Sequence, residues 1–192
     1  MKKKLIYFIL ATILVSPSWA DQESFVKAHE ILKSSDLSNN YQEVLYVISD
    51  GLRKNPDSIE LLQLRFNIYT SIRDLNNAYN DIIRLVKLRP NSSSYNFWMC
   101  VTKEALGYSM NSCIKCYEKV TNLSAEELGD KKEFDYGYIC ALLLSENPQG
   151  KVLAEKFLQK LSDSKVDQYI RDTLENFDRK KFLPVYKTHS SQ

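Results

Sequence analysis

The sequence is poor in the residues that interrupt helices. Only five of its 192 residues are glycine and five are proline, a composition typical of helices joined by short turns. Histidine is also scarce, with His29 and His189 as the two in the chain. The sequence contains no glycine-rich phosphate loop, no helix with paired histidines and no nucleophile elbow. We therefore expect no catalytic residue, no cofactor and no metal ion, and we predict that the protein is not an enzyme.

The chain also lacks an excess of one charge. It holds 26 basic and 24 acidic residues, a formal net charge of +2. Three of the basic residues, at positions 2–4, belong to a predicted leader, so the remainder has 26 − 3 = 23 basic against 24 acidic residues. A nearly neutral chain has no electrostatic footprint for nucleic acid or for an anionic membrane. We expect neither of these as a partner.

Residues 1–20 have the pattern of a cleaved signal peptide. A positively charged start at residues 2–4 precedes an apolar core at residues 5–15. Ser18 and Ala20 are small residues at the two positions that signal peptidase recognises. The apolar run is shorter than the roughly 20 residues of a membrane-spanning helix. We expect cleavage before Asp21 and no stable membrane anchor afterwards. The pattern predicts a periplasmic protein of a Gram-negative bacterium.

A fixed spacing recurs in the rest of the chain. Val44, Ile48, Gly51 and Pro56 are separated by 4, 3 and 5 residues, and the same spacing returns 34 residues later in residues 78–90. Further copies cover residues 113–125 and 154–166, and we expect an insertion within residues 124–133. Spacings of 4 and 3 place side chains on one face of a helix, which a proline or turn residue then ends.

Another helix precedes each of the last three copies, at residues 58–72, 92–106 and 133–146. Two antiparallel helices per repeat form a hairpin, and stacked hairpins bury the apolar faces that one pair leaves exposed. An apolar stripe at residues 166–177 predicts a terminal capping helix. We therefore predict a signal peptide at 1–20, a helical repeat domain of about four hairpins plus capping helix at 21–183, and a flexible tail at 184–192.

The period resembles that of the tetratricopeptide repeat (TPR) family. The residues that carry this resemblance, over about residues 25–164, are the small Ala78 and Ala154, the large Ile82, Tyr117 and Leu158, the run Cys116–Val120, and Pro56 and Pro90 at repeat ends. The sequence departs from the family at Phe66 and Cys100, where small residues are usual, and at Arg65, where leucine is usual. The resemblance implies an all-α, right-handed solenoid of antiparallel helical hairpins that binds another protein or peptide segment.

The four cysteines, Cys100, Cys113, Cys116 and Cys140, leave three interpretations open. Cys113 and Cys116 could form a redox dithiol, but the repeat places them inside a helix, away from the N-terminus that depresses a thiol pKa. Four cysteines could bind zinc, although the usual two close pairs are missing. An even count in an exported chain favours structural disulfides. Alignment of Cys100 with Phe66 of the preceding repeat favours Cys100–Cys113 together with Cys116–Cys140.

The first helices of such hairpins line a concave surface that binds ligands. We expect this surface to be formed by the residues about one turn before and after the packing residues of the first helices. These residues are His29, Lys33, Gln63, Asn67, Thr70, Phe97, Val101, Glu104, Ile139, Leu143 and Glu146, and Trp98 lies beside them. Some TPR proteins clamp a terminal carboxylate with lysines and asparagines in this groove. Asn67 matches that pattern but the lysines are missing, so we expect an amphipathic or extended segment as the ligand.

These features favour a periplasmic, non-catalytic adaptor or scaffold. An immunity protein that neutralises a toxin delivered to the same compartment is the main alternative, and a thiol-disulfide redox protein is a third possibility. In the first two cases we expect Phe97, Trp98 or Val101 to contribute more to partner binding than charged residues of the outer helices, because large anchors dominate interfaces.

Overall fold

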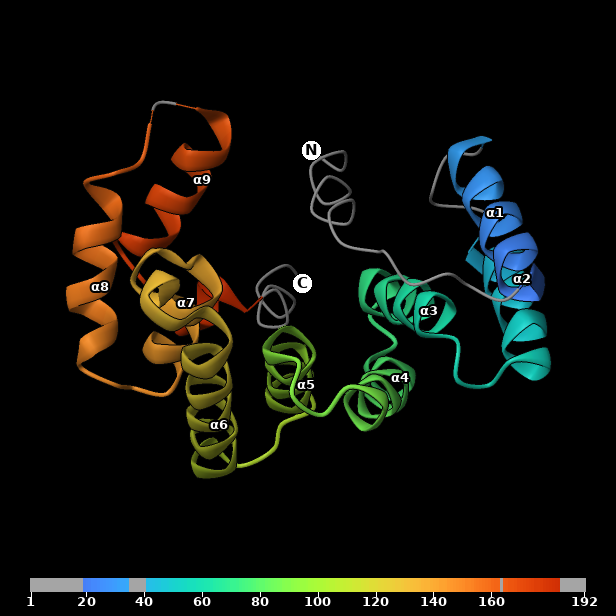
Figure 1. Ribbon diagram of the computed structural model, residues 1–192, viewed down its shortest axis with the longest axis horizontal. Helices are drawn as coiled ribbons and strands as arrows, with labels where there is room; N and C mark the ends of the chain where they lie inside the picture. The colour runs from blue at the N-terminus through green and yellow to red at the C-terminus, as the bar shows by residue number, and fades with distance from the viewer. Residues whose placement is uncertain (1–18, 35–40, 163, 184–192) are drawn as a thin grey trace, which may run out of the picture. The chain divides into compact units, whose positions relative to one another are not determined.

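A computed structural model describes residues 19–34, 41–162 and 164–183, and these residues form helices and turns without a β-strand (Figure 1). The helices are α1 (Trp19–Ser34), α2 (Tyr41–Lys54), α3 (Ile59–Ile72), α4 (Leu75–Leu88), α5 (Ser93–Ala105), α6 (Met110–Leu128), the 3₁₀ helix η2 (Gly129–Phe134), α7 (Tyr136–Leu144), α8 (Gln149–Leu158), α9 (Lys165–Leu174) and α10 (Arg179–Phe182). The predicted signal peptide up to residue 18, and the tail at 184–192, lie outside the described residues.

The chain divides between Leu61 and Leu62 into two compact units, which we describe separately. In unit 1, α1 and α2 form a hairpin in which Val44 and Ile48 of α2 are buried. A Cβ atom on Gly51 would lie 2.6 Å from Leu61 Cδ1 and 2.8 Å from Ser24 Cβ. Glycine at this repeat position therefore permits a close approach that no larger residue would.

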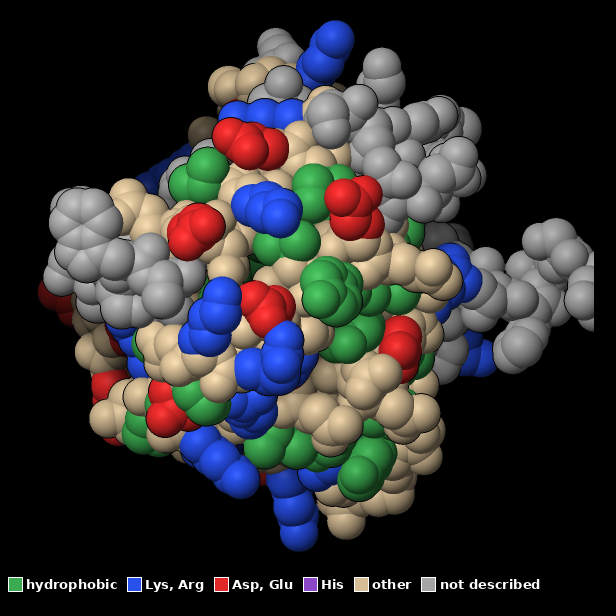
Figure 2. All heavy atoms as spheres, turned by 90° about the vertical axis from the view of Figure 1, so that its right-hand side faces the viewer, with side chains coloured by type: hydrophobic (Ala, Val, Ile, Leu, Met, Phe, Trp, Pro, Cys, Tyr) green, Lys and Arg blue, Asp and Glu red, His purple; other side chains and the backbone are tan. Residues whose placement is uncertain are grey.

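Figure 2 shows the face of the molecule on which α1 and α2 lie. Lys and Arg side chains alternate there with Asp and Glu, and hydrophobic side chains appear in small groups between them. Tyr46 and Val26 are among the exposed apolar residues of this unit. Such a mixed face is ordinary for the solvent side of a helical hairpin.

Unit 2 begins with most of α3 and continues as consecutive hairpins: α3 with α4, α5 with α6, and α7 with α8 (Figure 1). The predicted packing positions Ala78 and Ile82 in α4 and Cys113 and Tyr117 in α6 are buried, whereas Leu158 in α8 is half-buried. The predicted insertion is real, because α6 runs to Leu128 and η2 follows before α7 begins.

The turns of the three hairpins in unit 2 are built alike. Arg73, Gly107 and Glu146 follow the ends of α3, α5 and α7, and all three have positive φ, at 64°, 80° and 60°. Each donates its amide to the carbonyl three residues back, and the next residue donates to the carbonyl five residues back. This is the Schellman arrangement that ends a helix and reverses the chain.

The terminal cap differs from its prediction in extent. The helix α9 ends at Leu174, and its buried side is formed by Ile170 and Leu174, whereas Val166 and Tyr169 of the predicted stripe are exposed. A second short helix, α10, follows and returns toward α5. The predicted all-α array of helical hairpins with a C-terminal cap is therefore confirmed, with the cap made of two helices.

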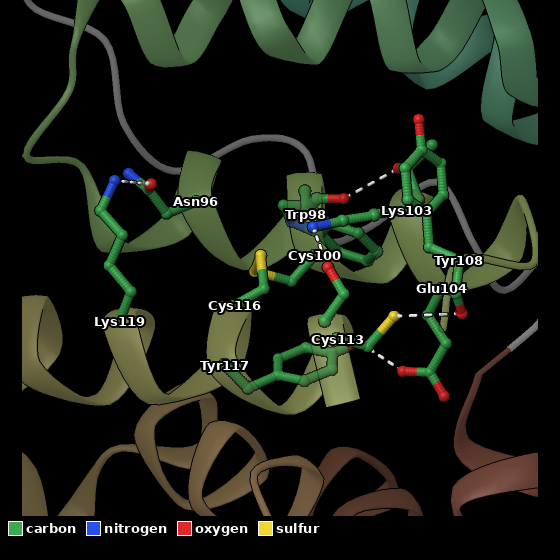
Figure 3. The surroundings of a disulfide bond; sticks show 12 residues. Asn96, Trp98, Cys100, Lys103, Glu104, Tyr108, Cys113, Cys116, Tyr117 and Lys119 are labelled. Atoms are coloured by element: carbon green, nitrogen blue, oxygen red, sulfur yellow. Dashed lines mark hydrogen bonds between the residues drawn. A yellow bond between two sulfur atoms is a disulfide. The ribbon is translucent and has the colours of Figure 1, made fainter. Parts of the chain in front are cut away.

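The predicted disulfide pairing is wrong. Cys100 is bonded to Cys116 across the α5–α6 hairpin, with a Cα–Cα distance of 5.6 Å, while Cys113 and Cys140 are buried free thiols. In Figure 3 the sulfurs of Cys100 and Cys116 meet between the two helices, and Cys113 points toward the carbonyl oxygen of Tyr108. Cys140 instead packs in another cluster, with Ile139 and Leu142 of its own helix.

The physical reason lies in the heights of the cysteines along the two helices. Cys100 is five residues before the end of α5, and Cys113 and Cys116 are three and six residues after the start of α6. At about 1.5 Å of rise per residue, Cys116 is nearly level with Cys100, whereas Cys113 is closer to the turn. The repeat alignment placed Cys113 opposite Cys100 and turned Cys116 toward Cys140 of the next hairpin, whereas Cys116 faces Cys100.

Candidate partner-binding site

A small hollow lies on the inner side of the α3–α4 hairpin where α5 packs against it. Its volume is about 50 Å³, and it is lined by Gln63, Phe66, Asn67, Ile82, Leu85, Ser94, Tyr95 and Trp98. We call this site the α3–α5 hollow. The rims come from α3 and α5, and the two residues from α4 are buried and form its base.

Helical spacing places the polar residues of the hollow on one edge. Gln63 and Asn67 are four residues apart on α3, so their amides project from the same face one turn apart. The Tyr95 hydroxyl donates to Gln63 Oε1 at 3.3 Å, which joins the two rims. The Ser92 hydroxyl caps α5 by accepting from the Tyr95 amide, and this fixes where the first turn of α5 begins.

The aromatic edge of the hollow is held by ring contacts. Phe66 meets Trp98 edge to face, with ring centroids 6.4 Å apart, and Phe97 meets Trp98 at 5.8 Å. Phe66, which stands where the family usually has a small residue, thus supports the indole. Trp98 keeps 39% of its surface exposed even so. A large aromatic side chain that is held in place but open to solvent is suited to contact a ligand.

The hollow is lined by uncharged side chains. Its eight lining residues are amides, hydroxyls, aliphatic side chains and aromatic rings, and none carries a charge. Amide groups can donate to and accept from the backbone of a bound segment, and Trp98 can cover an apolar side chain. The ion pair between Arg65 and Asp81 is internal to the α3–α4 hairpin.

The structure brings together three of the predicted binding residues, Gln63, Asn67 and Trp98, in this hollow. Thr70 is one turn beyond Phe66, and its hydroxyl donates to the Phe66 carbonyl at 2.7 Å. Phe97 is half-buried beside the hollow and packs toward Tyr117.

His29 and Lys33 belong to unit 1 and are described within it. The Nδ1 atom of His29 lies 3.0 Å from the Phe25 carbonyl oxygen, and the two rings are 4.2 Å apart. Lys33 is exposed near the end of α1. The imidazole is thus engaged within its own helix.

Three of the residues predicted to face a ligand are instead buried: Val101, Glu104 and Ile139. Ile139 packs against α8 and α9 side chains, and Leu143 lies half-buried against the same cluster. Glu104 is ion-paired with Arg179 of α10, and Glu146 is exposed, 3.6 Å from the same guanidinium. The expectation of an open face at α5 and α7 is wrong because the C-terminal segment covers it.

Five of the eight lining residues were not among the predicted binding residues: Phe66, Ile82, Leu85, Ser94 and Tyr95. Tyr95 belongs to an aromatic group at the start of its helix, a signal that could have placed it at the rim. Phe66 is buried in the hairpin and also lines the hollow. No sequence pattern marks Ser94.

Two of the four cysteines form the Cys100–Cys116 disulfide, and the other two, Cys113 and Cys140, are buried free thiols. Burial raises the pKa of Cys113, with a further increase from Glu104, and burial raises the pKa of Cys140 to about 12. Both groups therefore stay protonated near neutral pH, which does not suit nucleophilic thiol chemistry. Among residues 19–34, 41–162 and 164–183 no cluster of three His, Cys, Asp or Glu side chains could hold a metal ion.

None of the helices described is both long and apolar enough to cross a membrane.

Two solved structures resemble the protein in fold. A mutant of the O-GlcNAc transferase of Thermobaculum terrenum matches 79% of this chain with a TM-score of 0.53 and 20% identity. The MamA RS-1 ArsTM double mutant matches 84% with a TM-score of 0.54 and 13% identity. The matched region is 28% of the transferase chain and 88% of the MamA chain. Both neighbours contain TPRs, so the predicted TPR-like fold is confirmed. No protein-family model and no curated protein matches the sequence.

Proposed function

We propose that this protein is a non-catalytic scaffold that binds a segment of another protein at the α3–α5 hollow. The proposal rests on one observation. Trp98, which is partly exposed and held by its contact with Phe66, lines the same small hollow as the amides of Gln63 and Asn67. An apolar anchor beside groups that bond a peptide backbone is a common arrangement for segment recognition. The TPR-like fold of its structural neighbours supports the same role.

We further propose that the protein works in an oxidising compartment, the periplasm. The support is the Cys100–Cys116 disulfide together with the signal-peptide pattern of residues 1–20. N-terminal sequencing of the exported protein tests this, and a chain that starts at Asp21 is expected. An intact Met1 in a membrane fraction would contradict it.

The affinity for the partner distinguishes a scaffold from an immunity protein. Very tight binding of one partner would favour the immunity protein, since a scaffold binds more moderately.

The binding proposal is tested by affinity capture from periplasmic extract with three immobilised variants. Asn67→Ala and Trp98→Ala should each reduce capture of the partner that wild type retains, by about tenfold for Trp98. Lys115→Ala, at an exposed position on α6, is the control and should capture as wild type does.

Because Trp98 also supports Phe66 and Phe97, its loss could disturb the hairpin. Circular dichroism therefore accompanies each variant, and Asn67→Ala, which removes a polar rim group, serves as the independent variant. Equal capture by wild type, Asn67→Ala and a folded Trp98→Ala would exclude the hollow as the binding site.

A further inference from the structure

The C-terminal segment of the described chain, Asp178–Leu183, lies on α5 and α7 of unit 2. In Figure 1 it is the red end of the ribbon, which leaves α9 and passes α7 toward α5. Its helix α10 spans four residues, Arg179–Phe182. Isolated helices shorter than about 12 residues are marginal in water, so the surface beneath this turn determines its conformation.

Arg179 anchors the segment. Its Nε donates to Glu104 Oε1 at 2.6 Å, its Nη2 donates to Glu104 Oε2 at 3.1 Å, and its Nη1 donates to the Leu144 carbonyl at 2.8 Å. The paired contact of a guanidinium with a carboxylate is a strong and geometrically specific interaction. Tyr117 of α6 donates to the same Oε2 at 3.1 Å, so the array itself orients the Glu104 carboxylate.

Apolar side chains of the segment complete the contact. Leu183 is fully buried, in one cluster with Val101 of α5 and with Ala141 and Leu144 of α7. Phe182 packs against the same cluster. The segment thus binds as a short ligand does, through one charged anchor and a pair of apolar side chains at the third and fourth positions after it.

A helix that only capped the array would contact the last hairpin. Arg179 does contact the last hairpin, at the Leu144 carbonyl, but it also reaches Glu104 of α5, 75 positions earlier in the chain. The surface it covers includes Val101 and Glu104, at the helical positions that sequence reasoning assigned to ligand binding. The segment therefore occupies the side of α5 and α7 on which hairpin arrays bind other chains.

We propose that this surface, the α5–α7 face, is a second peptide-binding site, held in this structure by the chain's own residues 178–183. Its external ligand is a protein segment with arginine followed at the third and fourth positions by phenylalanine and leucine, Arg-x-x-Phe-Leu. Such a segment binds when it displaces the tethered one. Glu104 recognises the arginine, and Val101, Ala141 and Leu144 form the apolar part of the site.

The test uses the full chain and a labelled synthetic peptide of residues 176–183, acetylated and amidated so that it carries no terminal charge. In wild type the tethered segment competes at a high effective concentration, so the peptide should bind weakly. Arg179→Glu places a like charge beside Glu104 and should release the tethered segment. Fluorescence anisotropy should then show roughly tenfold tighter binding, or more, than in wild type. Leu183→Asp is a second release variant that acts through the apolar contact.

Two controls define specificity. A peptide with alanine in place of its arginine should not bind the released chain, and Glu104→Gln in the Arg179→Glu chain should weaken binding of the unaltered peptide. Lys115→Ala in the released chain should leave peptide binding unchanged, because Lys115 is exposed on α6. The α3–α5 hollow is a separate site. Failure here therefore leaves the proposal for the hollow untouched.

Three results would overturn the proposal. The first is a folded Arg179→Glu or Leu183→Asp chain that does not bind the peptide. The second is wild type that binds it as tightly as the released variants, which would place the peptide elsewhere. The third is loss of helical circular dichroism in both variants, which would make residues 178–183 an obligatory part of the folded array.

Discussion

At the scale of single residues, the Cys100–Cys116 disulfide connects α5, which contributes to both proposed sites, with α6. Cys100 lies two residues after Trp98 and four before Glu104, so the bond lies between the α3–α5 hollow and the α5–α7 face along α5. It closes a loop of 16 residues. A cross-link over a loop of this length lowers the entropy of the unfolded chain, which corresponds to about 3 kcal/mol of stabilisation. The disulfide thus holds α5 against α6.

We predict that replacing Cys100 and Cys116 together by serine lowers the free energy of unfolding by about 3 kcal/mol. Urea denaturation measures this, and wild type in reducing buffer should lose a similar amount. Non-reducing peptide mapping should recover Cys100 joined to Cys116, with Cys113 and Cys140 alkylated only after unfolding. A map that joins Cys113 to either partner would contradict the structure. Partner binding should persist in the double variant, because neither sulfur lines the hollow.

At the scale of helices, the α3–α4 hairpin is held by an ion pair in an otherwise apolar interface. Arg65 donates through Nε and Nη2 to the two carboxylate oxygens of Asp81, at 2.8 and 2.7 Å. The Asp81 side chain is only 2% exposed. This pair accounts for arginine at a position where the family usually has leucine, since the facing helix supplies an acid. The hydrogen bond to Asp81 is the main reason that the pKa of Arg65 is raised.

We predict that Arg65→Leu is strongly destabilising, by about 3 kcal/mol, because it leaves a buried carboxylate without its cation. Asp81→Leu should cost a comparable amount. The double variant Arg65→Leu/Asp81→Leu should cost clearly less than the sum, since two apolar residues suit this interface. Urea denaturation of all four proteins gives the coupling. Strictly additive losses would show that the pair contributes nothing beyond its separate side chains.

The sequence predicts the helices well because their signal is local. A 34-residue period and spacings of 4 and 3 identify one face of each helix, and Ala78, Ile82 and Tyr117 are buried as expected. The Gln63–Asn67 edge of the hollow follows from the same rule. Contacts between distant segments leave no such period. Nothing near Arg179 in the sequence points to Glu104, and so the covering of the α5–α7 face could not be predicted.

At the scale of the whole molecule, stability depends on keeping several weak acids protonated. Burial raises the pKa of Tyr117 and Tyr136 well above the ordinary value of 10.0, with Glu104 adding to the effect at Tyr117. Burial also raises the pKa of Cys140 from 9.0 to about 12. All three groups lie in unit 2. The folded state therefore favours the neutral form of each, whereas the unfolded chain releases these protons at ordinary pH values.

The direction of the pH dependence follows from this difference. Below pH 9 both states hold all three protons, so these groups contribute their full stability there. Above pH 9 the unfolded state loses first the Cys140 proton and then the tyrosine protons, and each loss favours unfolding. The contribution of Cys140 continues to fall until the pH passes its folded value of about 12. We therefore predict a nearly constant Tm around neutral pH and a steady fall above pH 9.

Thermal melts followed by circular dichroism across this range provide the measurement, with Tyr136→Phe as the matched variant. The substitution keeps the buried ring and removes one titrating hydroxyl. At neutral pH its Tm should differ from wild type by a fixed offset. Above pH 10 its Tm should fall less steeply than that of wild type, because one fewer proton separates the two states. Parallel curves up to pH 12 would mean that Tyr136 ionises alike in folded and unfolded chains, contrary to its burial between α7 and the terminal cap.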